Sequence, residues 1–419
     1  MKTNILRALS QKSFLYLWVG QVFTQISINL FNFFAIIVVF EKTQSNTAVA
    51  GVVLSFTIPA IIFGSIAGAY VDRWNKKTVL IVTNLLRSAL FFILAFFIDS
   101  IFVLYGISFL IALLTQFFIP AETPMVPLVV QKKHLLSANA LFGMGIYGSI
   151  MVAYVLSGPL IILLKPAGTL LFLAAMLVIG AFFILFIQLK SKHQKIDEEP
   201  KKVNIFKDLS NTFALMSRTN AVSQSLFLLC LSQVLILVLA TIAPGYAHQV
   251  LGISVEQFPL LFVAPAALGM VVGATILVNK FHSHPKQNVI TGGILLSGFA
   301  MMLLPYGSKV ASRGFVQVIN DYVPHIFEIN ILHIMVVLAF ILGVANSFIF
   351  VPANTLLQEK TSDEIRGKIY GFLNSFVGIL SLLPILIVGG LSDLIGVGVV
   401  IAIIGACLLG LGVVRVFIK

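Results

Sequence analysis

Twelve runs of about twenty apolar, nearly uncharged residues occupy most of the sequence and limit the folds that it can adopt. A bilayer's hydrocarbon core is about 30 Å thick, and a helix needs about 20 apolar residues to cross it. Strands of this length are rare, so we expect helices even where Phe, Ile and Val are frequent. The expected spans are residues 14–40, 48–71, 78–98, 101–119, 139–164, 168–189, 222–246, 259–279, 289–306, 331–351, 369–391 and 396–416. The sequence therefore predicts an all-α membrane protein with twelve transmembrane helices.

The composition excludes several classes of protein. The chain is 59% hydrophobic and 10% charged, whereas soluble domains have about 25% charged residues. The first apolar run is too long for a signal peptide, so we expect it to be retained. Cys230 and Cys407 lie within apolar runs, which favours small buried side chains over a disulfide or a metal site. The sequence contains no metal-ligand spacing and no Walker-type phosphate loop, so we expect no metal, no cofactor and no ATP-driven pumping.

Positive charges are concentrated in alternate connecting segments. With a cytoplasmic N-terminus, the inner segments hold 22 Lys and Arg residues and the outer loops hold 4. The positive-inside rule then predicts a plasma-membrane protein with both termini in the cytoplasm. This distribution accounts for the net charge of +12 without a nucleic-acid partner. We expect contact with the lipid bilayer and a monomeric state.

Two six-helix halves are expected, residues 1–189 and 222–419. Residues 190–221 carry both signs of charge and Pro200, which is typical of a flexible cytoplasmic linker. The segment PAET at 120–123 matches PANT at 352–355 near the ends of the fourth and tenth spans. A second polar stretch, 307–330, is expected outside the membrane with a short interfacial helix around Phe315–Tyr322. Two related six-span halves with a site between them are an architecture of secondary transporters.

The turn between the second and third spans gathers several strongly polar residues. It reads G-x-x-x-D-R-x-N-K-K from Gly68, and the five residues of interest are Gly68, Asp72, Arg73, Lys76 and Lys77. The pattern resembles motif A of the major facilitator superfamily, G-x-x-x-D-R-x-G-R-R/K. Asn75 replaces the second glycine, and asparagine can still adopt a left-handed turn. The stretches LYLWVGQVFTQIS and PAETP…LLSANAL are similar to the branch that contains macrolide-efflux and siderophore exporters. The resemblance covers essentially the whole chain and implies rocking of two halves about a central cavity.

This turn is expected to form an inner gate. Gly68 would allow close approach of a neighbouring helix. Asp72 could accept hydrogen bonds from the N-terminus of the eleventh span, around Ile365–Ile369, where the helix dipole favours an anion. The cations Arg73, Lys76 and Lys77 could pair with acids such as Glu122 or Glu359. Alternatively, the cations only set the topology, but that role would not need Asp72.

A row of amides marks the first span. Gln21, Gln25, Asn29 and Asn32 fall within an arc of about 80° at 100° per residue. Lipid would penalise this face, so it points inward, either lining a substrate cavity or hydrogen-bonding to neighbouring helices. The resemblance favours a cavity. Further cavity candidates in the second half are Gln233, Asn346 and Asn374, each of which could equally bond between helices.

Arg87 is the most deeply placed charge. It lies ten residues after Lys77, about 15 Å along the helix. A charge at that depth costs at least about 2.5–3.5 kcal/mol, and no span carries an acid at the same depth. One interpretation is that Arg87 lines the cavity and binds an anionic group of the substrate. The other is a structural arginine that is satisfied by Asn84, Gln116 and backbone carbonyls.

Features of the fifth span bear on direction and coupling. Gly158-Pro159 resembles the core of the antiporter motif C, G-x-x-x-G-P-x-x-G-G, although Tyr154 and Ile162-Leu163 replace three of its glycines. A simple helix kink is the alternative. Asp72 and Glu122 are the acids best placed to carry protons. Whether the chain is a proton antiporter or a uniporter stays open.

The sequence therefore predicts a transporter of small molecules. The expected function is export of an amphipathic drug, metabolite or siderophore by alternating access. A nutrient importer with the same fold and a non-transporting membrane scaffold or receptor are the alternatives. We expect no enzyme, because no nucleophile, base and metal come together.

Overall fold

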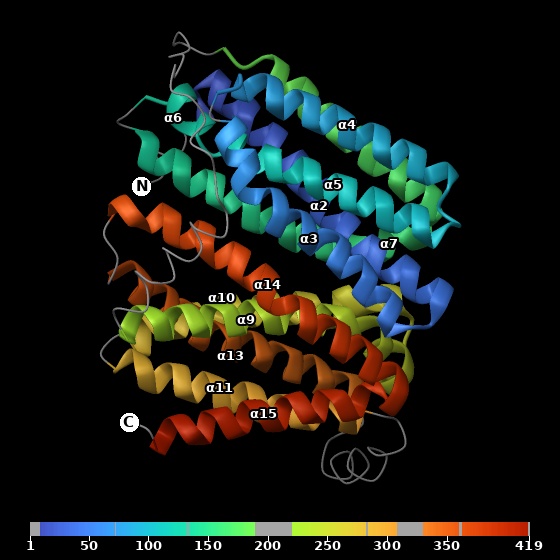
Figure 1. Cartoon of the computed structure of the whole chain (residues 1–419), viewed down its shortest axis with the longest axis vertical. Coiled ribbons are helices and arrows are strands. Elements are labelled where there is room, and N and C mark those ends of the chain that lie inside the picture. Colours follow the sequence, from blue (N-terminus) through green and yellow to red (C-terminus); the bar gives the residue numbers. More distant parts are fainter. Residues whose placement is uncertain are drawn as a thin grey trace. The chain divides into compact units, whose positions relative to one another are not determined.

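The computed structural model describes residues 9–71, 73–131, 134–188, 220–281, 284–307, 330–359 and 363–417, and these ranges form helices joined by short connections (Figure 1). The longer helices of the N-terminal part are α2 (Lys12–Thr43), α3 (Asn46–Val71), α4 (Lys76–Phe96), α5 (Ile101–Glu122) and α7 (Leu135–Leu185), with a short α6 (Met125–Val129). Those of the C-terminal part are α9 (Asn220–Gly245), α10 (Ala264–Lys280), α11 (Lys286–Leu303), α13 (Ile331–Glu359), α14 (Asp363–Ile395) and α15 (Val397–Phe417). Short π- and 3-10-helical segments cover Tyr246–Leu251, Val255–Gln257, Pro259–Val263 and Leu304–Gly307. No strand occurs in these ranges, so the all-α prediction is confirmed.

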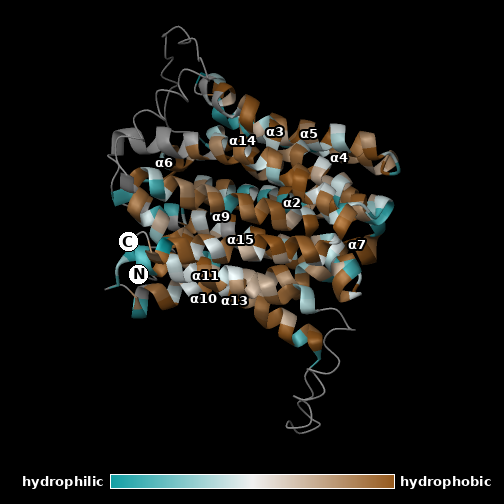
Figure 2. Ribbon diagram, turned by 60° about the horizontal axis from the view of Figure 1, so that its bottom comes forward, coloured by the Kyte–Doolittle hydropathy of each residue, from teal (hydrophilic) through white to brown (hydrophobic). Residues whose placement is uncertain are grey.

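Within the described residues, 11 helical segments are long and apolar enough to cross a membrane. One of them, Ser137–Leu185, has 49 residues, about twice the length that one crossing needs. It belongs to α7, which is broken at Lys165 (φ 59°, ψ 167°), between the predicted fifth and sixth spans. The structure is therefore consistent with twelve spans. Much of the helical ribbon is made of hydrophobic residues (Figure 2).

Local side chains determine where several helices begin and break. Asn75 has φ −66° and ψ 107° and accepts a hydrogen bond from the Thr78 backbone N–H, so it is the N-cap of α4. The expected left-handed turn at Asn75 is therefore wrong, because an extended residue can cap a helix and a left-handed one does not. Ser100 caps α5 in the same way. The helix α7 continues through Pro159 and breaks at Lys165.

The chain divides into two compact units. Unit 1 contains residues 1–38 and 54–208, and unit 2 contains 39–53 and 209–419. The boundary at 208/209 falls within the expected linker, of which residues 190–219 lie outside the described ranges, as does the expected helix at Phe315–Tyr322. The end of α2, the start of α3 and their connection group with unit 2, although both helices continue into unit 1.

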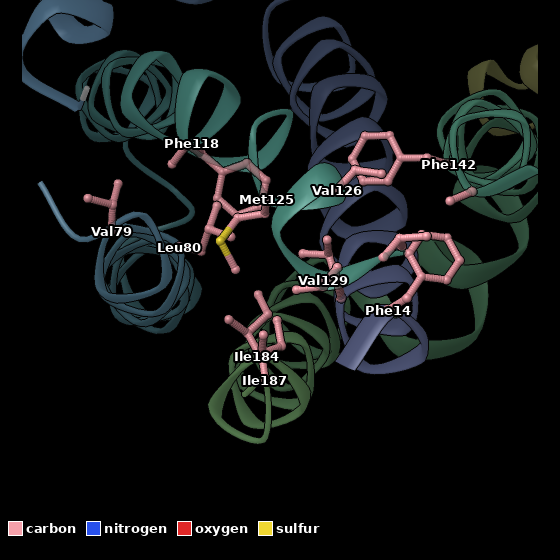
Figure 3. Close-up of a cluster of buried hydrophobic side chains, with 14 of the residues drawn as sticks. Phe14, Val79, Leu80, Phe118, Met125, Val126, Val129, Phe142, Ile184 and Ile187 are labelled. Atoms are coloured by element: carbon pink, nitrogen blue, oxygen red, sulfur yellow. The ribbon is translucent and has the colours of Figure 1, made fainter. Parts of the chain in front are cut away.

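In unit 1, α4 packs against α5 and α7. A buried cluster joins α2, α4, α5, α6 and α7, and its side chains include Phe14, Leu80, Phe118, Met125 and Ile184 (Figure 3). The helix α6 was not expected, and it closes this cluster with Met125, Val126 and Val129. This apolar cluster holds together the end of unit 1 at which α4 begins.

In unit 2, α13 packs against α9, α10 and α11, while α14 packs against α9 and α15. Glycines bring some of these helices into backbone contact. A Cβ atom on Gly269 would lie 2.0 Å from the Phe340 carbonyl oxygen, and one on Gly343 would lie 1.8 Å from the Ala266 carbonyl oxygen. The α10–α13 interface therefore depends on the absence of side chains at both positions.

Candidate functional site

Arg87 lies at the centre of a buried polar cluster in unit 1. Its guanidinium group donates to Asn84 Oδ1 (2.6 Å), to the Thr83 carbonyl oxygen (3.2 Å) and to Thr115 Oγ1 (3.4 Å). It also lies over the ring of Phe118, 4.4 Å from the ring centroid. The side chain is 0% exposed, so Arg87 does not line a cavity in this structure. Its contacts match the structural interpretation, with Thr115 in place of the expected Gln116, whose amide donates to the Ala112 carbonyl oxygen.

The acid near Arg87 is Glu122, which the sequence did not place at the same depth. The two groups interact electrostatically, and Glu122 is 4% exposed at the end of α5. Helical side chains point back toward the N-terminus of their helix. Arg87 therefore reaches toward the beginning of α4, and this is the end at which α5 terminates with Glu122.

The amide row of α2 connects to this buried pair. The Gln25 side chain hydrogen-bonds to the Glu122 carboxyl group, and Asn29 Nδ2 donates to Gln25 Oε1 at 3.3 Å. A polar chain thus runs from Glu122 through Gln25 to Asn29. Gln25, Asn29 and Asn32 are half-buried. Gln21 is 0% exposed and donates to the Phe142 carbonyl oxygen, so it serves helix packing rather than a cavity here.

The motif A turn is described only in part, because Asp72 lies outside the described residues. Arg73 is exposed. A Cβ on Gly68 would meet nothing within 4 Å, so the expected close helix approach is absent from the described part of this structure. Lys77 Nζ donates to the Leu185 and Ile187 carbonyl oxygens, both at 2.8 Å, at the C-terminus of α7.

The acids that were expected to pair with the motif's cations have other partners. Glu359 forms an ion pair with Lys286, which belongs to the same unit. Glu122 interacts with Arg87 and Gln25. Lys76 and Arg73 also have interaction partners. The sequence could not assign these pairings, because they join residues far apart in the chain.

Two of the three candidates in unit 2 can be described. Asn346 Oδ1 accepts a 2.6 Å hydrogen bond from Ser232 Oγ, and this links α13 to α9. Gln233 is half-buried on α9, and the Asn374 side chain lies outside the described part of the chain. The Ser232–Asn346 pair supports the interhelical interpretation of Asn346.

Comparisons with known proteins place the chain in a family. The model of the Major Facilitator Superfamily matches residues 17–320. Macrolide efflux protein A of Streptococcus pyogenes is 21% identical over 392 residues, covering 92% of this chain and 90% of that protein. An uncharacterised MFS-type transporter of Bacillus subtilis strain 168, YfiS, is 20% identical over 385 residues, covering 91% and 86%.

Solved structures show the same fold. A mutant of the nucleoside transporter NupG is 12% identical with a TM-score of 0.75, covering 96% of this chain and 99% of that chain. A POT family transporter in complex with 5-aminolevulinic acid is 13% identical with a TM-score of 0.71, covering 96% and 95%. The family match spans well over half of the sequence, and the helices of the chain are arranged as in these transporters. The chain therefore belongs to the major facilitator superfamily.

Proposed function

We propose that this transporter exports an amphipathic small molecule across the plasma membrane by alternating access, in exchange for protons. The observation that carries the direction is the alignment with a macrolide efflux protein over about nine tenths of both chains. The distribution of Lys and Arg supports cytoplasmic termini. In this orientation the turn at Asn75 faces the cytoplasm, and the connection between α2 and α3 faces outward.

The half-buried face of α2 is the proposed substrate surface. Asn29 and Asn32 supply amide groups, and Phe33 on the same helix packs edge-on against Tyr154 of α7 with ring centroids 4.4 Å apart. A surface that combines amides with an aromatic pair suits a molecule with polar and apolar parts, because each part finds a matching contact.

Cysteine labelling tests this surface. Single cysteines at Asn29 and Asn32, in a chain with Cys230→Ala and Cys407→Ala, are expected to react with a water-soluble thiol reagent. A transported substrate should slow the reaction several-fold. Gln21→Cys is the matched control, because Gln21 lies on the same helix and is 0% exposed, and it should stay unlabelled. If none of the three cysteines reacts, either with or without substrate, the amide row serves helix packing.

Glu122 is the proposed proton carrier. It is almost fully buried, and its Oε1 atom has no hydrogen-bond partner among the described residues. Intramembrane acids of this kind commonly bind and release protons during transport. The chain of contacts through Gln25 to Asn29 connects the acid to the proposed substrate surface, so substrate binding and protonation can influence one another.

Vesicle transport tests direction and coupling together. Inside-out vesicles from a strain stripped of its own exporters are expected to accumulate a radiolabelled macrolide or another hit from a compound panel. Collapse of the pH gradient should abolish accumulation, and Glu122→Gln should remove this dependence on the gradient. Glu359→Gln alters an exposed ion pair and should retain coupled transport. Uptake by right-side-out vesicles instead would show an importer, and gradient-driven accumulation by Glu122→Gln would place the proton elsewhere.

A further inference from the structure

The start of α3 is capped by an acid from a distant helix of the same unit. Asp393, two residues before the end of α14, accepts hydrogen bonds from the Asn46 backbone N–H (2.7 Å) and the Thr47 backbone N–H (2.9 Å). Three side-chain donors also reach this carboxylate: Ser45 Oγ (2.6 Å), Thr47 Oγ1 (2.7 Å) and Asn46 Nδ2 (3.0 Å). Helix N-termini have unpaired N–H groups and favour negative charge. Asp393 therefore holds the tip of α3 against α14.

Two glycines provide the space for this tip. A Cβ on Gly245 of α9 would lie 2.3 Å from Asn46 Oδ1, and one on Gly389 of α14 would lie 3.0 Å from the Asn46 carbonyl oxygen. Asn46 is fully buried, yet its Oδ1 has no hydrogen-bond partner in the described ranges. A buried acceptor without a partner weakens the docked arrangement, since it has given up its hydrogen bond to water. The tip is thus held in a defined position, although one of its buried hydrogen-bond acceptors has no partner among the described residues.

The helices α2 and α3 are divided between the two units. Residues 39–53 group with unit 2, whereas the remainder of α2 and α3 belongs to unit 1. A continuous helix cannot follow both units if they move with respect to each other. The contacts of the tip with Asp393 are polar and partly exposed, so water can replace them at low cost on release. The backbone contacts of Gly343 with α10 have no such replacement.

From these observations we propose that Asp393 is the latch of an outer gate, and that the tip formed by residues 39–53 leaves α14 when the transporter opens outward. The proposed latch joins α3 to α14 at one end of each helix. Asp393 lies near the C-terminus of α14 and caps the N-terminus of α3, at the end of α3 opposite the Asn75 turn. The inference rests on the proposed alternating-access cycle.

Spin-label distances test the latch without any substrate. Labels at Gln44 and at Val399 of α15, both exposed, report the separation of the tip from unit 2 in a chain lacking Cys230 and Cys407. Wild-type protein is expected to give a dominant short distance and a minor long one. Asp393→Ala should raise the ratio of long to short separations at least tenfold, because it removes all five hydrogen bonds.

The matched control is Asp99→Ala, another exposed acid next to a helix end, in unit 1, which should leave the distances unchanged. If Asp393→Ala does not fold, Ser45→Ala with Thr47→Val removes two donors from the opposite side and should raise the ratio at least threefold. A single short distance in the wild type and in the folded variants would overturn the latch. The distances are measured without substrate, so that result would leave the export proposal intact. Conversely, a failed export assay would not affect the test of the latch by spin-label distances.

Discussion

Replacing Gly343 by alanine is expected to destabilise the protein strongly. The new Cβ would lie 1.8 Å from the Ala266 carbonyl oxygen, and a backbone atom cannot move aside without moving α10. Overpacking of this kind costs about 1–3 kcal/mol. We expect the upper end because the same interface is equally tight at Gly269, where a Cβ would lie 2.0 Å from the Phe340 carbonyl oxygen. The midpoint of thermal unfolding and the monodisperse yield in detergent should both fall clearly.

Gly292→Ala is the matched control for this substitution. Gly292 lies within α11, and a Cβ there would meet nothing within 4 Å. Alanine is favoured over glycine in a helix interior by about 0.5–1 kcal/mol, so the control should be neutral or slightly stabilising. If helix propensity alone decided the outcome, both variants would gain stability. An unchanged unfolding midpoint for Gly343→Ala would show that α10 and α13 do not pack as described.

Replacing Arg87 by glutamine is the second substitution with a large expected effect. The shorter, neutral side chain cannot satisfy Thr83, Asn84 and Thr115 together, and it removes the cation near Glu122. Leaving a buried hydrogen-bonding group without its partner costs about 1–3 kcal/mol. We expect loss of folded protein or a much lower unfolding midpoint. Arg87→Lys should be intermediate, because an ammonium group keeps the charge but lacks the planar fork.

Lys286→Gln is the control for Arg87→Gln. It also removes a cation from an acid, but the Lys286–Glu359 pair is exposed, and such pairs contribute about 0–1 kcal/mol. Its unfolding midpoint should stay close to that of the wild type. Normal stability of Arg87→Gln, together with selective loss of anionic substrates, would instead support a substrate-binding arginine.

The architecture was predictable because membrane crossing imposes a minimum apolar length on every span. The break in α7 at Lys165 falls within the predicted gap between residues 164 and 168. Helix ends differ by a few residues where capping decides them. The α4 helix begins at Lys76 instead of residue 78 because Asn75 caps it. Hydropathy carries no information about capping, so the exact ends of such helices can be located only from the local hydrogen bonds.

The buried contacts were less accessible to sequence reasoning. Counting residues along a helix places the Cα atom of Arg87, but its long side chain bends toward the beginning of α4 and reaches the surroundings of Glu122. The Asp393 cap joins residues 346 positions apart, and no local pattern signals it. Asp393 lies two residues before the end of α14, and its partners could only be found from the structure.

Two kinds of contact join the helices, and they differ in their response to hydration. In unit 2, the Gly269 and Gly343 contacts are between backbones, and they remain equally favourable whether or not water reaches them. In unit 1, hydrogen bonds such as Asn84 to Thr24 (2.9 Å) and Ser88 to the Ala174 carbonyl oxygen (2.9 Å) contribute to the joints between helices. Water competes for such groups. A thinner or more permeable lipid environment would therefore loosen the hydrogen-bonded joints between helices before the glycine contacts, so the composition of the surrounding membrane would decide which joints yield first.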